Sequence, residues 1–162
     1  MWKDHDAAVM QADELLKKMT LQEKAGQICQ KLYGFRSYEV VPNSSEISLS
    51  KDFTSEFDKY GSMGVLYGLY RADPWSERTF ENGLYGDRAR TAYNLIQKYA
   101  LEHARLHIPI MISTECPHGQ QSPDGYLLPV NLAMGAGFDP DAVYKAYQEC
   151  GKQMYDMGVH VA

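Results

Sequence analysis

Apolar residues recur at intervals of three and four along several segments of this chain, which is the spacing of one face of an α-helix. The pattern predicts a helix over about residues 6–19 and a second, short helix from Leu21, where Thr20 and Glu23 form a capping box. Further helices are expected through Phe53 and Phe57 up to Gly61, over residues 89–104, and from Asp139-Pro140 to Met157, with Gly158 as its end.

Short apolar runs lie between these helices and predict buried β-strands. The runs are residues 28–32, 63–67, 108–113 and 159–162. Long loops are expected over residues 34–50 and 70–86. Because strands that alternate with helices pair in parallel through right-handed crossovers, the chain is predicted to have an α/β fold. Such a pattern suits either half of a (β/α)₈ TIM barrel or a small doubly wound sheet.

The last predicted strand runs up to the final residue, Ala162, with no polar tail after it. A buried strand that ends in this way leaves one of its edges without a partner. We therefore expect residues 1–162 to be a truncated piece of a larger domain.

Composition narrows the class of protein. The chain is 44% hydrophobic and 23% charged, as soluble globular domains are. Its net charge is −5 and it has no run of Lys and Arg, so we expect no nucleic-acid partner. No apolar stretch reaches the ~20 residues of a membrane span, and the first residues lack the apolar core of an export signal. We therefore expect no membrane partner, a cytoplasmic location, and reduced thiols at Cys29, Cys116 and Cys150.

Candidate chemistry lies in the loop after the strand at residues 108–113, because ligands of parallel α/β folds bind at the carboxyl ends of the strands. Glu115 stands two residues past that apolar run, where its carboxylate can accept hydrogen bonds from neighbouring sugar hydroxyls. His118 can donate to a hydroxyl or hold Glu115 in position. A solvated or helix-capping acid and a histidine bonded to the backbone are the alternatives that stay open.

Aromatic and charged residues also follow the strand at residues 63–67. They are Tyr67, Tyr70, Arg71, Asp73 and Trp75. Trp and Tyr rings stack on the apolar faces of sugars, and Arg forks onto hydroxyls or a carboxylate. The alternative is an ordinary loop anchored by its Trp.

We expect no metal and no cofactor. Cys116 and His118 form only one close pair of possible metal ligands, and nothing near Cys116 identifies a base that would make it a nucleophile. The chain also lacks the glycine-rich motifs that cradle nucleotide phosphates.

Several short motifs follow one another along nearly the whole chain. They are Leu15-Leu16-x-x-Met19-Thr20-Leu21-x-Glu23-Lys24-x-x-Gln27, Asn94-x-x-Gln97, Arg105-Leu106-His107-Ile108-Pro109, Glu115-Cys116-Pro117-His118-Gly119, Leu128-Pro129 and Phe138-Asp139-Pro140. In this order and at these separations they resemble the N-terminal barrel domain of family 3 glycoside hydrolases, the β-glucosidase and β-xylosidase group.

The resemblance implies a (β/α)₈ barrel, of which this chain holds about the first half. It also implies retaining hydrolysis of β-glycosides through a covalent glycosyl-enzyme. The acidic residue that opens the His-Gly loop of the family, commonly Asp and here Glu115, binds sugar hydroxyls. We expect Glu115, His118 and Trp75 to be substrate-binding residues for a small β-glycoside.

The family's nucleophile motif, of the Ser/Thr-Asp-Trp kind, does not occur in this sequence, and its acid/base usually comes from beyond the barrel. No catalytic residue is therefore expected here, and the fragment alone is expected to be inactive. The alternatives are a non-catalytic α/β module that binds a carbohydrate or a protein, and a degraded gene product without function.

Overall fold

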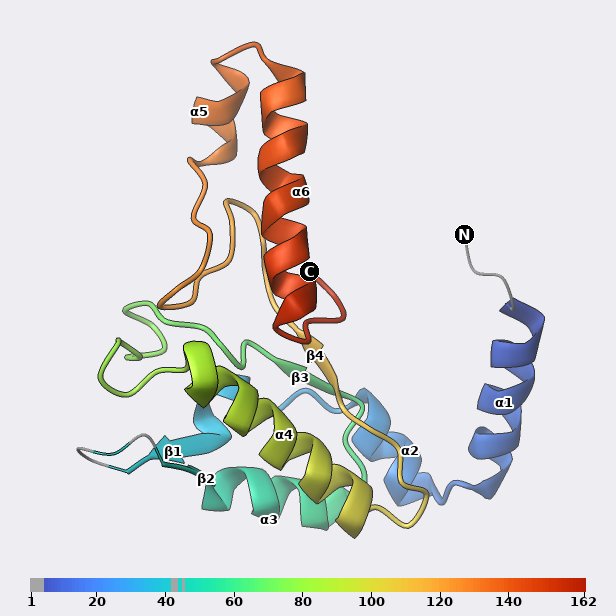
Figure 1. Ribbon diagram of the computed structural model, residues 1–162. Helices are drawn as coiled ribbons and strands as arrows, with labels where there is room; N and C mark the ends of the chain where they lie inside the picture. Colours follow the sequence, from blue (N-terminus) through green and yellow to red (C-terminus); the bar gives the residue numbers. More distant parts are fainter. Residues whose placement is uncertain (1–4, 42–43, 45) are drawn as a thin grey trace.

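The computed structural model describes residues 5–41, 44 and 46–162, which form a mixed α/β structure (Figure 1). Its helices are α1 (His5–Lys18), α2 (Leu21–Ile28), the 3₁₀ turn η1 (Gly34–Arg36), α3 (Lys51–Tyr60), α4 (Gly86–His103), α5 (Asn131–Gly135) and α6 (Pro140–Asp156). Its strands are β1 (Tyr38–Val40), β2 (Ile47–Leu49), β3 (Val65–Tyr67) and β4 (Met111–Ser113). None of the helices in the described ranges is long and apolar enough to cross a bilayer.

Strands β3 and β4 are parallel, with Leu66 opposite Ile112, as the sequence predicts. Single parallel bridges extend this pairing on both sides, from Tyr33 to Tyr67 and from Ser113 to Val161. Four segments therefore lie next to one another in the order in which they occur along the chain. No closed barrel is present in the described part of the chain.

The predicted helices are confirmed, and so are three of the residues expected to begin or end them. Thr20 and Glu23 form the expected capping box, and Asp139 accepts a hydrogen bond from the backbone N–H of Ala142 at 2.9 Å. Gly61 ends α3 in the left-handed region, with φ of 64°. Helix α1 forms as expected but buries none of its residues.

The strand predicted at residues 28–32 is wrong. Helix α2 continues to Ile28, and the parallel contact is made later, at Tyr33. Gly26 lies inside α2, and a side chain there would collide with the backbone of Ser62 and with Tyr60. A glycine is therefore required here because the chain after α3 approaches closely, and not because the helix ends.

The predicted loop at residues 34–50 is also wrong in part, because it contains η1 and an antiparallel pair formed by β1 and β2. Each strand has only three residues, which is too few for a clear alternation, and part of the connection lies outside the described residues. Helix α5 was not predicted either, because its five residues are too few to show a helical period. The predicted strand at residues 159–162 is reduced to the bridge at Val161.

The core lies between the parallel strands and the helices α3 and α4. Leu66 and Ile112 are fully buried in the two strands, and Phe53 and Phe57 are fully buried on α3. Helix α4 faces this core with small residues and one larger one, which are Ala89, Ala92, Ile96 and Ala100. This packing fixes β3 and β4 in register, and the loops that follow them thereby meet.

Candidate functional site

Glu115 lies two residues beyond β4, and an arginine from the loop after β3 holds its carboxylate. Arg71 Nη1 donates a hydrogen bond to Glu115 Oε2 at 3.0 Å. The contact joins residues 44 positions apart in sequence, and it follows from the parallel register of β3 and β4. The Glu115 side chain is 54% exposed, so its oxygens can accept further hydrogen bonds from a ligand.

Arg71 is itself fixed by its neighbours. Its Nε donates to Asp73 Oδ2 at 2.6 Å and its Nη1 donates to the Tyr67 hydroxyl at 2.8 Å. The Arg71 side chain is only 17% exposed and that of Asp73 only 13%. A guanidinium with this many fixed acceptors has one orientation, and it therefore positions the more exposed Glu115.

The surroundings of Arg71 favour an ionised Asp73 and a neutral Tyr67. Partial burial works against ionisation of Asp73, but the backbone N–H of Ser76 and the Arg71 guanidinium hold its pKa below the ordinary value. Burial, and then the neighbouring Glu115 carboxylate, raise the pKa of Tyr67. Tyr67 therefore remains a neutral hydroxyl and accepts from Arg71.

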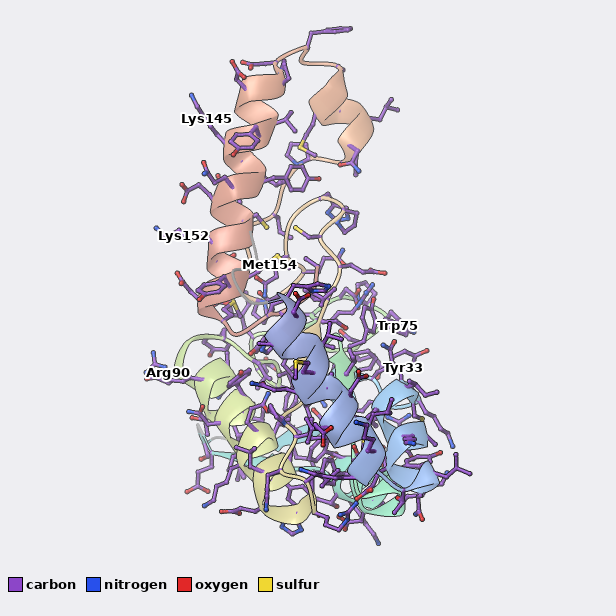
Figure 2. The ribbon with its side chains drawn as sticks, turned by 90° about the vertical axis from the view of Figure 1, so that its right-hand side faces the viewer. Tyr33, Trp75, Arg90, Lys145, Lys152 and Met154 are labelled. Carbon is purple, nitrogen blue, oxygen red and sulfur yellow. The ribbon has the colours of Figure 1, made fainter. Side chains whose placement is uncertain are left out.

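Aromatic rings form one wall of the site. The Trp75 ring lies 4.7 Å from the Arg71 guanidinium, 4.8 Å from the Tyr33 ring and 5.0 Å from the Phe35 ring. Figure 2 shows Tyr33 and Trp75 close together on one side of the molecule. Trp75 is 50% exposed and Tyr33 is 40% exposed, so both rings offer apolar faces to a ligand.

The loop that carries Trp75 is held to the rest of the site. Arg78 donates from Nε and Nη2 to the carbonyl oxygen of Phe35, at 3.0 and 2.6 Å. Its guanidinium also lies 4.5 Å from the ring centre of Tyr38. Arg78 therefore joins the loop that carries Trp75 to the segment that carries Tyr33 and Phe35.

The structure brings Glu115 and Trp75 together through Arg71, but it does not bring His118 into this contact. The His118 side chain is half-buried, and among the described residues its ring makes no hydrogen bond. Its carbonyl oxygen accepts from the backbone N–H of Leu128 at 2.8 Å. The group that holds Glu115 is therefore Arg71.

Tyr33 and Phe35 are site residues that the sequence analysis missed. The first strand was placed at residues 28–32, so Tyr33 fell outside it. The signal that could have found it is its position: Tyr33 and Tyr67 are bridged partners, and both lie where parallel segments end. Residues at such ends converge on one edge.

The site contains two carboxylates, but only Glu115 is open to a ligand. Asp73 is bound by Arg71 and Ser76 and is largely covered. Retaining glycoside hydrolysis needs two carboxyl groups ~5–5.5 Å apart that both reach the substrate. Within the described ranges there is also no cluster of three or more His, Cys, Asp or Glu that could hold a metal ion.

Fold and site together define an α/β chain with an acidic, aromatic-lined site where parallel strands end. The model of the glycosyl hydrolase family 3 N terminal domain matches residues 79–162, just over half of the chain. The chain belongs to this family. The matched part includes Glu115 and His118 and begins shortly after Trp75.

A curated relative has a longer chain. It is a protein of Formosa agariphila named "Putative beta-xylosidase", 26% identical over 149 residues. The match covers 92% of this chain and 18% of that protein. The chain therefore spans less than a fifth of the length of this relative.

Proposed function

We propose that residues 1–162 form the first part of the (β/α)₈ barrel of a retaining β-glycoside hydrolase and supply part of its sugar-binding site. Membership of the family supports a hydrolase parent, and the name of the Formosa relative supports β-xylosides, beside β-glucosides, as substrates. The four parallel segments in chain order support the barrel, because a singly wound barrel pairs its strands in that order.

The observation that carries the proposal is the Arg71–Glu115 contact beside the Trp75 ring. In our proposal the Glu115 carboxylate accepts hydrogen bonds from two neighbouring hydroxyls of the sugar, while Trp75 and Tyr33 pack against its apolar face. Arg71 holds the Glu115 carboxylate in one orientation before the sugar arrives. His118 is proposed as a donor to a sugar hydroxyl.

The bond-breaking groups are proposed to lie in other parts of the parent protein, since Glu115 alone cannot serve as both nucleophile and acid/base. The fragment by itself is then inactive. We propose the cytoplasm as its compartment, and the three free cysteines are compatible with a reducing environment.

The test is Glu115→Gln in the full-length parent, assayed with aryl β-xylosides and aryl β-glucosides. We expect kcat/KM to fall by ~10²-fold or more, because hydrogen bonds to a charged acceptor that strengthen in the transition state are lost. Glu102→Gln is the matched control, since Glu102 is exposed on α4 and its one ion pair among the described residues is with Lys98 at 3.9 Å. Equal activity of the Glu115 variant and the control would remove Glu115 from the site.

A non-catalytic sugar-binding module is the second candidate. It is favoured by one observation, that Tyr33, Arg71, Trp75 and Glu115 all come from this chain and already meet in it. To test this candidate, a Trp2→Phe variant of this chain is titrated with xylose or xylobiose while the fluorescence of Trp75 is recorded. Saturable binding that Glu115→Gln weakens by about tenfold or more, in a parent that hydrolyses no glycoside, would favour the module.

A further inference from the structure

Two cysteines that are far apart in sequence meet beside the site. Cys116 Sγ and Cys150 Sγ lie 3.3 Å apart, across 34 positions of sequence. Cys116 directly follows Glu115 and is half-buried, whereas Cys150 is fully buried on α6. Such an approach of two thiols requires α6 to pack against the loop that carries Glu115.

We propose that Cys116 and Cys150 are a reversible oxidation site, at which a small-molecule disulfide of the glutathione type converts the two thiols into an intramolecular disulfide. This inference goes beyond the proposed sugar-binding function and does not depend on it. The oxidised form links the residue next to Glu115 covalently to α6.

The geometry requires little movement. A disulfide bond is ~2.05 Å long, so the two sulfur atoms need to approach by only about 1.3 Å. We expect rotation of the two side chains to supply this change.

The two backbones are already held together on both sides of the sulfur pair. Tyr147 of α6 donates from its hydroxyl to the carbonyl oxygen of Pro117 at 2.6 Å. One turn beyond Cys150, Gln153 donates to the carbonyl oxygen of Asp124 at 2.9 Å and accepts from the backbone N–H of Tyr126 at 2.7 Å. These contacts keep the thiols opposite each other and favour the intramolecular disulfide over one with a second molecule.

The difference in burial sets the order of the steps. Burial, and then the contact with Cys116, raise the pKa of the Cys150 thiol to about 11. The more accessible Cys116 therefore reacts first. Its thiolate attacks one sulfur of the small disulfide and forms a mixed disulfide with it, while the original S–S bond breaks and the other half leaves as a thiolate that takes a proton.

The second step closes the protein disulfide. Cys150, once deprotonated, attacks Cys116 Sγ, and the second small thiol leaves and is protonated. The two cysteines together lose two electrons and two protons, and the small disulfide gains them as two thiols. We expect Cys29 to take no part, since the sulfur pair in contact is Cys116 and Cys150, whereas Cys29 Sγ lies beside Glu56, 3.8 Å from Oε1.

The structure predicts two consequences of oxidation. The new bond closes a loop of the chain and restricts the unfolded state, so Tm is expected to rise by about 5–10 °C. Because the second step needs a Cys150 thiolate, disulfide formation is expected to speed up as pH rises from 7 to 9.

The experiment uses the full chain with Cys29→Ser, incubated in glutathione buffers of graded ratio and then alkylated. Peptide mapping is expected to show a Cys116–Cys150 disulfide in the monomer. A reductant should reverse it, and while it is present neither cysteine should be alkylated by iodoacetamide. Cys116→Ser and Cys150→Ser are the matched variants, and each is expected to lose the link and the gain in Tm. In the Cys150→Ser variant a glutathione adduct should accumulate on Cys116.

The same mapping on the unsubstituted chain guards against variants that fail to fold. Free thiols at both positions under oxidising buffer, or disulfides only between molecules or with Cys29, would overturn the proposal. A Cys116–Cys150 link that forms equally fast in urea would also overturn it, since the folded contact would then contribute nothing.

Discussion

The Glu23 carboxylate accepts two hydrogen bonds from the Arg105 guanidinium, from Nε at 3.0 Å and from Nη2 at 2.8 Å, across 82 positions of sequence. The same carboxylate accepts from the backbone N–H of Thr20 at 2.7 Å. Arg105 Nη2 also donates to the carbonyl oxygen of Lys18 at 2.8 Å. One glutamate therefore caps α2 and ties the start of that helix to the segment after α4.

This contact predicts how stability depends on pH. The hydrogen bonds from Arg105, followed by the one from Thr20, lower the pKa of Glu23 to about 2, against about 4.3 for an ordinary glutamate. A depressed pKa in the folded state contributes stability that is present above the ordinary value and is lost as pH falls towards 2. We expect Glu23→Gln to lower Tm at pH 7 and the difference from wild type to shrink between pH 5 and about 2.

Thermal unfolding at a series of pH values measures this effect. Glu14→Gln is the control, because Glu14 is an exposed residue of α1 whose partner is Lys17, one turn away. A difference in Tm that stays constant down to the lowest pH would contradict the assignment.

Gly119→Ala is expected to destabilise the fold by about 2–4 kcal/mol. Gly119 has φ of 89°, and an added side chain would lie 2.8 Å from the backbone nitrogen of Leu128. Gly135→Ala is the control, because an added side chain there meets nothing within 4 Å. Urea unfolding measures both, and equal midpoints would show that the loop adapts freely.

Gln97→Leu is expected to cost about 2–4 kcal/mol, because it leaves two buried backbone groups without partners. Gln97 Nε2 donates to the carbonyl oxygen of Ile110 at 2.7 Å, and its Oε1 accepts from the Ile110 N–H at 3.0 Å. Gln148→Leu, at an exposed position of α6, is the matched substitution and should change stability little. Urea unfolding distinguishes the two, and a neutral Gln97→Leu would mean that water replaces the lost bonds.

In the proposed full-length hydrolase, Arg71→Lys is expected to lower kcat/KM by about tenfold, since an ammonium cannot bridge Asp73, Tyr67 and Glu115 at once. As a positioning residue Arg71 acts through Glu115, so Arg71→Lys in the Glu115→Gln background should add little. Arg90→Lys, exposed on α4, serves as control. Full additivity of the two losses would show that Arg71 acts by another route.

Local signals were enough where a few neighbouring residues determine the structure. The capping box at Thr20, the cap at Asp139 and the end of α3 at Gly61 are each defined within one turn of helix, and each is confirmed. The short pair of β1 and β2 and the helix α5 escaped prediction because three to five residues carry too little periodicity. The end of α2 was not predicted, because Gly26 lies inside the helix and its small size serves a tertiary contact with Ser62.

By itself the sequence determined the helices of eight or more residues, the two central parallel strands, the family and the candidate residue Glu115, because these depend on local spacing and on ordered motifs. The partners of that residue were decided by tertiary structure alone. Arg71 reaches Glu115, and Cys116 reaches Cys150, only once β3 and β4 are in register and α6 is packed. Spacing along a chain does not encode such distances, since they arise when separate elements bury their apolar faces against one another.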